Sequence, residues 1–514
     1  MALFGGGKPD HPMADIKQAR ALIAELPANN AQKALEEVTF WLDSIIRTEG
    51  FTLDQRYQLF DLLDQAAKNH QRKLSQEYLA TNRQDRFREN KLWTANFEFW
   101  KMLGAAYDQC IDQFRSGAGN ASAVRKNIPT IIARVMRVLT LQLKWILLRY
   151  GLVDDRAWGD LGRLYMFAED SGMVASPVEI YPGQHGQGTI RQEFLKALML
   201  SISSTDGLTP LKQEIAERAV AHFGSLYMLQ PEPAPGYNYF FDVSARKPPA
   251  RVIKGAEPGK TMRYFGAGPA LPALEQLMRD ITANRIVPPS VNLGGTYELD
   301  VVTSVLQHLA LYWSDTPPAR NSERRKIATQ MTVVNGFQQI VASVAPAAED
   351  DSLDFQETSR GESWIVENVS DGGFGAIIPQ GKVDWLKVGA LLGVQTETAQ
   401  FWGAGMVRRL TRDEFQQRRA GIQLLSMAVI PAMLTPAADS SSFSANSDGS
   451  PALLLSSAPD KNGEIVLLLR EGSFSPRQAF NMEVRGKQYY LMPGRLVEGG
   501  EDFDLASFKV MKRE

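Results

Sequence analysis

The chain has 514 residues, which is too long for one hydrophobic core and predicts two to four domains. Its 44% apolar and 22% charged residues are typical of a soluble globular protein, and a net charge of −2 argues against general binding to DNA, RNA or an acidic membrane surface. The single cysteine, Cys110, excludes an intrachain disulfide and a multi-cysteine metal site.

The first residues lack the apolar core of a signal peptide, and no run of about 18 apolar residues occurs along the chain. A single cysteine is also typical of a reducing compartment. We therefore expect a cytoplasmic protein that does not insert into a membrane.

Residues 14–313 are predicted to form a helical domain, because apolar residues recur there at helical spacing. Thr52 and Gln55 have the spacing of a capping box, which predicts a helix start at this point. Other helices are expected over residues 83–114, 129–150, 190–203, 209–227, 271–284 and 297–313.

The helix expected over 129–150 mixes apolar residues with Arg134, Arg137, Lys144 and Arg149. Cations on such a helix usually form a solvated face, and this is the interpretation we favour. An anion-binding role is the alternative.

The segment Trp158-Gly-Asp-Leu161-Gly162-Arg-Leu-Tyr165 matches the first helix of a tetratricopeptide repeat. Pro177, Pro182 and Gly183 fall where the second helix would continue, and no 34-residue period recurs. The segment is therefore predicted to be one helix of a bundle.

An irregular hairpin is expected near 237–265, where proline residues alternate with strand formers. The helical domain gives no recognised family. The chain has no G-x-S-x-G or HExxH motif and no histidines at metal-ligand spacing, so we expect neither an enzyme nor a metal site.

Residues 320–430 read as a small β-barrel, because short apolar runs alternate there with turn residues. Two polar signals accompany this pattern: Arg320 and Arg324, four residues apart, and Asn368-Val-Ser370-Asp-Gly-Gly373. Arginine forks pair with phosphates and with the O6 and N7 edge of guanine, and their flat groups stack on bases. The second signal adds short polar side chains and a glycine that backbone or ligand can approach closely.

In this order, the two signals resemble the cyclic di-GMP signature of the PilZ domain family. The resemblance spans about a fifth of the chain and implies a PilZ-like β-barrel that binds cyclic di-GMP, with no cofactor. The ligand-binding residues that it implies are Arg320, Arg324, Asn368, Ser370 and Gly373, with Arg325 assisting.

Two further segments complete the prediction. Residues 345–360 are rich in Asp and Glu and are expected to form a solvated loop inserted in the barrel. Residues 436–451 have the composition of a flexible linker, and residues 452–512 are expected to form a small β module.

Together these features predict a multidomain protein, mainly α at its N-terminus, followed by a PilZ-like barrel and a short β module. We expect a bacterial cyclic di-GMP receptor or effector that couples nucleotide binding to a protein partner of the helical domain. The resemblance implies a role in motility, adhesion, pili, biofilm or exopolysaccharide output. The alternatives are a scaffold that uses the same barrel without ligand and, as a third reading, an enzyme with its site in the helical domain.

Overall fold

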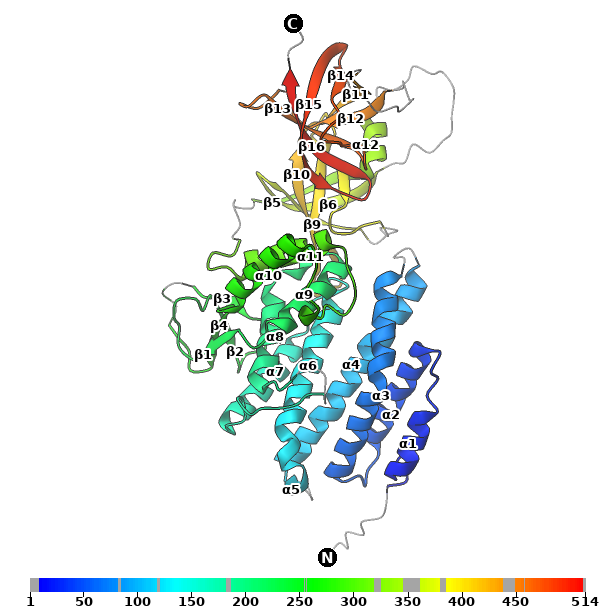
Figure 1. Ribbon diagram of the computed structural model, residues 1–514, viewed down its shortest axis with the longest axis vertical. Coiled ribbons are helices and arrows are strands. Elements are labelled where there is room, and N and C mark those ends of the chain that lie inside the picture. The colour runs from blue at the N-terminus through cyan, green and yellow to red at the C-terminus, as the bar shows by residue number, and fades with distance from the viewer. Residues whose placement is uncertain are drawn as a thin grey trace, which may run out of the picture. The chain divides into compact units, whose positions relative to one another are not determined.

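The computed structural model describes residues 9–81, 85–117, 121–181, 186–253, 255, 257–318, 325–344, 361–379, 385–437, 449–456 and 458–511. The chain divides into two compact units, Met1–Ala319 and Arg320–Glu514, which are described separately. Figure 1 labels their helices and strands.

The first unit is built mainly from helices packed around one apolar core. The expected capping box is confirmed at the start of α3, where Thr52 and Gln55 bond reciprocally to each other's backbone N–H. The helices are α1 Ile16–Ala24, α2 Ala31–Arg47, α3 Leu53–Ala80, α4 Arg86–Arg115, α5 Ala121–Val124, α6 Ile128–Leu147, α7 Asp155–Asp170, α8 Ile190–Ile202, α9 Pro210–His222, α10 Ala270–Asn284 and α11 Leu299–Trp313.

Helix α6 lies within this unit in contact with α4, α7, α8 and α9. We favoured the interpretation that its cations form a solvated face. This interpretation is wrong for Arg134 and Lys144, which are each only 3% exposed. Arg134 pairs with Asp61 of α3, and the Lys144 Nζ lies 2.8 Å from Glu214 and 3.3 Å from Glu217 of α9. Buried cations require such partners, and these partners come from segments far away in the sequence.

Helix α7 carries the repeat-like motif and is a single helix of the bundle, as predicted. Its aromatic residues pack on neighbouring elements: Trp158 lies 6.2 Å from Phe241, and Tyr165 stacks on Phe194 at 4.0 Å between ring centroids. A Cβ added at Gly162 would lie 2.2 Å from the Val243 carbonyl oxygen. The glycine of the motif therefore allows the chain after β2 to lie directly against the helix.

The region expected to be an irregular hairpin forms a small antiparallel sheet with strand order β1-β4-β2-β3. It contains two strands more than a hairpin, because Ala250–Arg251 pairs with β2 and Met228–Gln230 pairs with β4. The strands are β1 Met228–Gln230, β2 Tyr239–Asp242, β3 Ala250–Arg251 and β4 Met262–Gly266.

The second unit contains two closed six-stranded barrels, so the predicted class of a helical region followed by β modules is confirmed. The first barrel has the order β10-β7-β6-β5-β8-β9 and the second has the order β11-β12-β13-β16-β15-β14. The strands of the first are β5 Arg325–Asn335, β6 Glu362–Ser370, β7 Gly373–Ile377, β8 Leu391–Thr396, β9 Gly403–Arg412 and β10 Arg418–Ser426. Those of the second are β11 Ile430–Pro436, β12 Ser450–Leu454, β13 Glu464–Arg470, β14 Phe480–Val484, β15 Lys487–Gly499 and β16 Phe503–Met511.

Strand β11 closes the second barrel by pairing with both β12 and β14. It lies before the segment expected to be a linker, so the second barrel takes residues from both sides of that segment. Residues 438–448, the middle of the expected linker, lie outside the described residues.

Helix α12 (Gly336–Val344) was not predicted from the sequence. The Phe337 N–H donates to the Asp502 carboxylate at 2.7 Å, so the group that caps this helix lies 165 residues further along the chain. Phe337 and Ile340 belong to a buried apolar cluster that also includes Met406 of the first barrel and Phe503 of the second. The two barrels therefore share part of their core with this helix.

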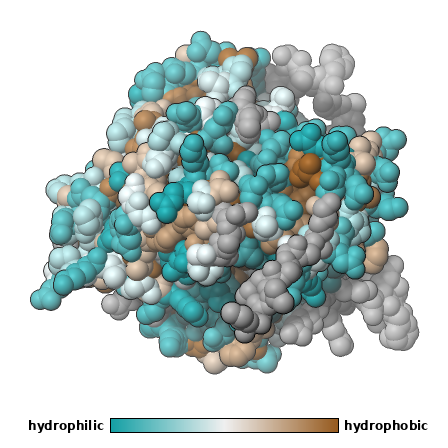
Figure 2. Space-filling view, turned by 90° about the horizontal axis from the view of Figure 1, so that it is seen from below, coloured by the Kyte–Doolittle hydropathy of each residue, from teal (hydrophilic) through white to brown (hydrophobic). Residues whose placement is uncertain are grey.

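In the described part of the chain, no helix is long and apolar enough to cross a bilayer. Figure 2 shows one face of the molecule, on which polar side chains predominate and apolar residues occur in small groups. Scattered apolar residues of this kind are normal on a protein surface.

Substituting Gly162→Ala is expected to destabilise the helical unit by about 1–3 kcal/mol, since the new methyl group has to displace the Val243 backbone. Urea unfolding followed by far-ultraviolet circular dichroism measures the change. Gly259→Ala is the matched control, because a Cβ there meets only the Met262 side chain, at 3.4 Å or more. Equal unfolding midpoints for the two variants would contradict the packing argument.

The buried ion pairs of α6 predict a loss of stability in acid. Burial raises the pKa of Glu217, but Lys144 and Arg218 outweigh burial and lower this pKa from 4.5 to about 2. The contribution of this carboxylate is therefore complete above about pH 4.5 and is lost as the pH falls towards 2.

Glu217→Gln should reduce the difference in unfolding free energy between about pH 5 and about pH 3, by an amount on the order of 1–3 kcal/mol. Urea titrations at both pH values test this, with exposed Glu232→Gln as the control. A pH dependence in Glu217→Gln as steep as in the wild type would show that this carboxylate is not the titrating group.

Candidate functional site

Strands β6 and β7 form a hairpin that carries the second predicted signal. Ser370 and Gly373 are register partners on either side of a two-residue turn, and the Ser370 hydroxyl donates to the Gly373 carbonyl at 3.4 Å. Gly373 has φ +155°, and a Cβ there would lie 1.9 Å from the Ile422 carbonyl oxygen of β10. Only glycine lets β10 approach the end of the hairpin this closely.

Asn368 lies beside this turn, on the outside of the barrel. Its amide covers Gly375, where an added Cβ would come within 2.6 Å of both Oδ1 and Nδ2. The Asn368 Oδ1 is buried, and no described residue donates a hydrogen bond to it. An acceptor that is buried without a donor costs free energy, so this oxygen is suited to a donor from outside the described residues.

A row of register partners continues from Asn368 across the outer face. Asn368 is opposite Gly375, Gly375 is opposite Gly421, and Gly421 is opposite Arg409 of β9. The adjacent residues Ala376 and Ala420 are 1% and 2% exposed and face the barrel core, so the two glycines face outward. The row therefore has no side chain between Asn368 and Arg409: Gly375 is buried beneath the Asn368 amide, and Gly421 is partly exposed.

The predicted arginine segment leads into β5, which pairs with β6 next to Asn368. Arg325, exposed at the first position of β5, is opposite Val369, and Lys326 is opposite Asn368. Arg325, Asn368, Ser370 and Gly373 are thus brought together at one end of the β5-β6-β7 ladder. Arg320 and Arg324 lie outside the described residues, and so does the acidic segment 345–360.

The sequence analysis did not identify the arginines of β9 and β10 as neighbours of this site. Arg419 of β10 forms ion pairs of 3.2 Å with both Glu367 of β6 and Asp413, and its buried Nε has no hydrogen-bond partner among the described residues. Arg409 lies at the far end of the glycine row. The runs "VRRLTR" and "QQRRAG" contain these residues, but only the register relates them to Asn368.

This arrangement is suited to a flat, anionic ligand. At the partly exposed Gly421 a planar group can approach the sheet, the Asn368 amide can hydrogen-bond to it, and guanidinium groups lie on two sides. Among the described residues, no group of three or more His, Cys, Asp or Glu side chains could hold a metal ion.

Residues 17–234 match the model of a family described as "Cyclic-di-GMP receptor FimW, N-terminal domain". The match covers α1 to α9 and β1, which is less than half of the 514 residues. It falls within the helical domain, for which the sequence analysis recognised no family, and corrects that result. It does not extend to the barrel that resembles PilZ domains.

No curated protein matches the chain. The family match therefore relates the helical unit to the N-terminal domain of a cyclic di-GMP receptor, whereas the likeness to PilZ domains still depends on the residues of the first barrel.

Proposed function

We propose that this protein is a cyclic di-GMP receptor and that the ligand binds at the outer face of the first barrel. Two independent features support this proposal. The helical unit is similar to the N-terminal domain of a family named for such a receptor, and the barrel carries the arginine and Asn-x-Ser-x-x-Gly signals in the order of the PilZ signature.

The observation that carries the proposal is the register of β5 on β6. Arg325 is opposite Val369, so the segment with Arg320 and Arg324 enters the barrel one residue from Asn368. Arg320 and Arg324 would bind the phosphates and stack on or pair with guanine, and Arg325 would assist. The Asn368 amide and the Ser370 hydroxyl would contact the nucleotide, and Gly373, which is buried against β10, would hold the hairpin that positions them.

Binding would then act on a protein partner through the helical unit. Arg320 and Arg324 lie in the chain between α11 and β5, so a ligand bound by them would restrain the link between the two units. We propose that the receptor is cytoplasmic, is not itself an enzyme, and acts in motility, adhesion, pilus or exopolysaccharide control.

A scaffold that uses the barrel only for protein contacts is the second candidate. The observation that favours it is that Arg419 is already neutralised by Glu367 and Asp413, which leaves less positive charge for a ligand. The two candidates differ in whether cyclic di-GMP binds to the purified protein.

Calorimetric titration of the full chain with cyclic di-GMP distinguishes them. We expect micromolar or tighter binding to the wild type and at least about tenfold weaker binding to Arg324→Ala and to Asn368→Ala, since each loses a hydrogen bond to a charged or buried group. Arg477→Ala, an exposed arginine of the second unit, is the matched control, and GMP is the control ligand. No heat with cyclic di-GMP at high concentration would favour the scaffold.

Hydrogen exchange tests the coupling separately from binding. Cyclic di-GMP should slow exchange in the β6-β7 hairpin and at the start of β5, and also in α11, which precedes the arginine segment. Protection confined to the barrel would leave the receptor proposal intact and refute the coupling.

A further inference from the structure

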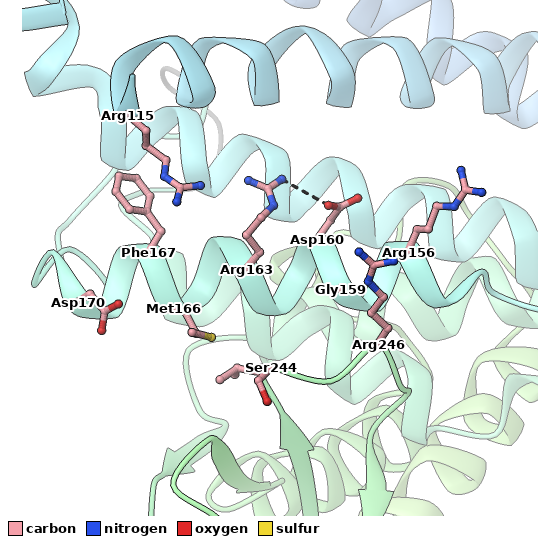
Figure 3. A pocket seen from close by; sticks show the side chains of 11 residues that line it. Arg115, Arg156, Gly159, Asp160, Arg163, Met166, Phe167, Asp170, Ser244 and Arg246 are labelled. Atoms are coloured by element: carbon pink, nitrogen blue, oxygen red, sulfur yellow. Dashed lines mark hydrogen bonds and ion pairs between the residues drawn. The ribbon is translucent and has the colours of Figure 1, made fainter. Parts of the chain in front are cut away.

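The groove of about 620 Å³ along α7 shows how the helical unit neutralises its cations (Figure 3). The Arg163 guanidinium in this groove lies 3.4 Å from Asp160 and 2.8 Å from Asp108. The buried cations of α6, Arg134 and Lys144, are paired with carboxylates in the same way. A partly buried cation with neither a carboxylate nor another hydrogen-bond acceptor therefore stands out in this unit.

Lys68 of α3 and Arg137 of α6 are two such cations. Both are half-buried, and neither forms an ion pair with a described residue. The buried Nε of Arg137 has no hydrogen-bond partner among these residues, although a buried donor without an acceptor costs free energy. The residues of this unit that lie outside the described ones contain no Asp or Glu, so they supply no carboxylate for either cation.

Both cations contact the ring of Tyr181, in the segment between α7 and α8. The Lys68 Nζ lies 3.9 Å from the ring centroid and the Arg137 Cζ lies 5.8 Å from it, so the two charges are at most about 10 Å apart. The Arg134 Cζ lies 5.4 Å from the same centroid. An aromatic ring attracts cations but does not neutralise them. Three positive charges are therefore held at one ring, and only that of Arg134 has a carboxylate partner.

The charged groups linked to this ring carry a positive net charge. Glu214 and Glu217 of α9 are balanced by Lys144 and Arg218, and Arg137 also lowers the pKa of Glu217. The linked set has five cations and four carboxylates: Lys68, Arg134, Arg137, Lys144 and Arg218, with Asp61, Asp64, Glu214 and Glu217. Exposed Arg72 of α3 and exposed Glu179, two residues before Tyr181, add one charge of each sign. Its unpaired charge is that of Lys68 and Arg137.

The electrostatics at Lys68 show the same imbalance. Burial lowers the pKa of Lys68 most, Asp64 raises it, and Arg134 and Arg137 lower it further. An anion next to Lys68 and Arg137 would oppose the repulsion between them and would give the Arg137 Nε an acceptor. Lys68, Arg137 and Tyr181 are each partly exposed, so a ligand can reach them from solvent.

We propose that Lys68 and Arg137, beside the Tyr181 ring, bind a small phosphate-bearing anion. A phosphate group has several acceptor oxygens, which suit an arginine fork and a lysine approaching from different helices. Arg72 lies on the same face of α3 as Lys68, four residues further on, and forms no ion pair with a described residue, so it can contact the outer part of a larger ligand. The site belongs to the helical unit alone and does not depend on the barrel site.

Amine labelling of the full chain tests the proposal at Lys68 itself. An N-hydroxysuccinimide ester acetylates accessible lysines, and mass spectrometry gives the rate at each one. Inorganic phosphate, pyrophosphate, GMP and cyclic di-GMP are compared with sodium chloride at equal ionic strength. We expect one or more of these anions to slow acetylation of Lys68 by about fivefold at a concentration of about four times Kd, while exposed Lys33 keeps its rate.

The anions distinguish two sources of the phosphate group. Protection by inorganic phosphate, pyrophosphate or GMP indicates a ligand with a terminal phosphate, whereas protection by cyclic di-GMP alone indicates a phosphodiester. Arg137→Gln should abolish the protection, and Arg279→Gln, at an exposed arginine of α10, should keep it. Asn368→Ala should also keep it, which separates this site from the barrel. Unchanged labelling of Lys68 with all four anions would overturn the proposal, and so would protection that survives in Arg137→Gln or is lost in Asn368→Ala.

Thermal unfolding gives a second test that does not depend on labelling or on the folding of Arg137→Gln. The anion that protects Lys68 should raise the unfolding temperature of Asn368→Ala, because it binds only to the folded chain. Adding Lys68→Gln to this variant should remove the rise, whereas adding Lys33→Gln should not. Equal rises in the two double variants would refute the site.

Discussion

Neutralisation of the buried cations of α6 is the interaction on which the helical unit depends. Removing a guanidinium or an ammonium group from water costs several kcal/mol, and only a well-placed carboxylate offsets this. Arg134 finds Asp61 and Asp64 on α3, and Lys144 finds Glu214 and Glu217 on α9. These pairs favour one packing of α3 and α9 on α6, whereas apolar contacts alone would tolerate several registers.

A different constraint, the close approach of neighbouring segments, shapes the candidate site in the barrel and the packing of α7. In the barrel, Gly373 lets β10 approach the β6-β7 turn, and Gly375 leaves room for the Asn368 amide. In the helical unit, Gly162 and Gly159 of α7 do the same for the chain after β2. In both places a neighbouring segment of the protein fills the space left by the missing side chain.

The sequence predicted well the features that depend on local patterns. The α3 capping box, the single helix at Trp158 and the succession of helices and β modules follow from spacing within a few residues. Features that depend on pairing between distant residues could not be predicted from the sequence. Three such features relate residues more than 30 positions apart in the chain. They are the ion pairs of Arg134 and Lys144, the cap of α12 by Asp502, and the position of Arg409 relative to Asn368. Helix α12, which has nine residues and takes its cap from Asp502, was not predicted either. The residue types of the candidate site could be predicted from the sequence. That Gly375 and Gly421 lie side by side on the outer face could be seen only from the register of the strands.

Helix α12 has a consequence for how such a chain could evolve. Its apolar residues, with Asp502 at its first turn, are covered from both barrels, so the two barrels share an apolar cluster in addition to the second barrel's own core. Removing the second barrel would expose Phe337 and Ile340 to water, and replacing it would require a new group to accept the Phe337 N–H. The two barrels are therefore expected to be inherited together, as one indivisible module rather than as two interchangeable ones.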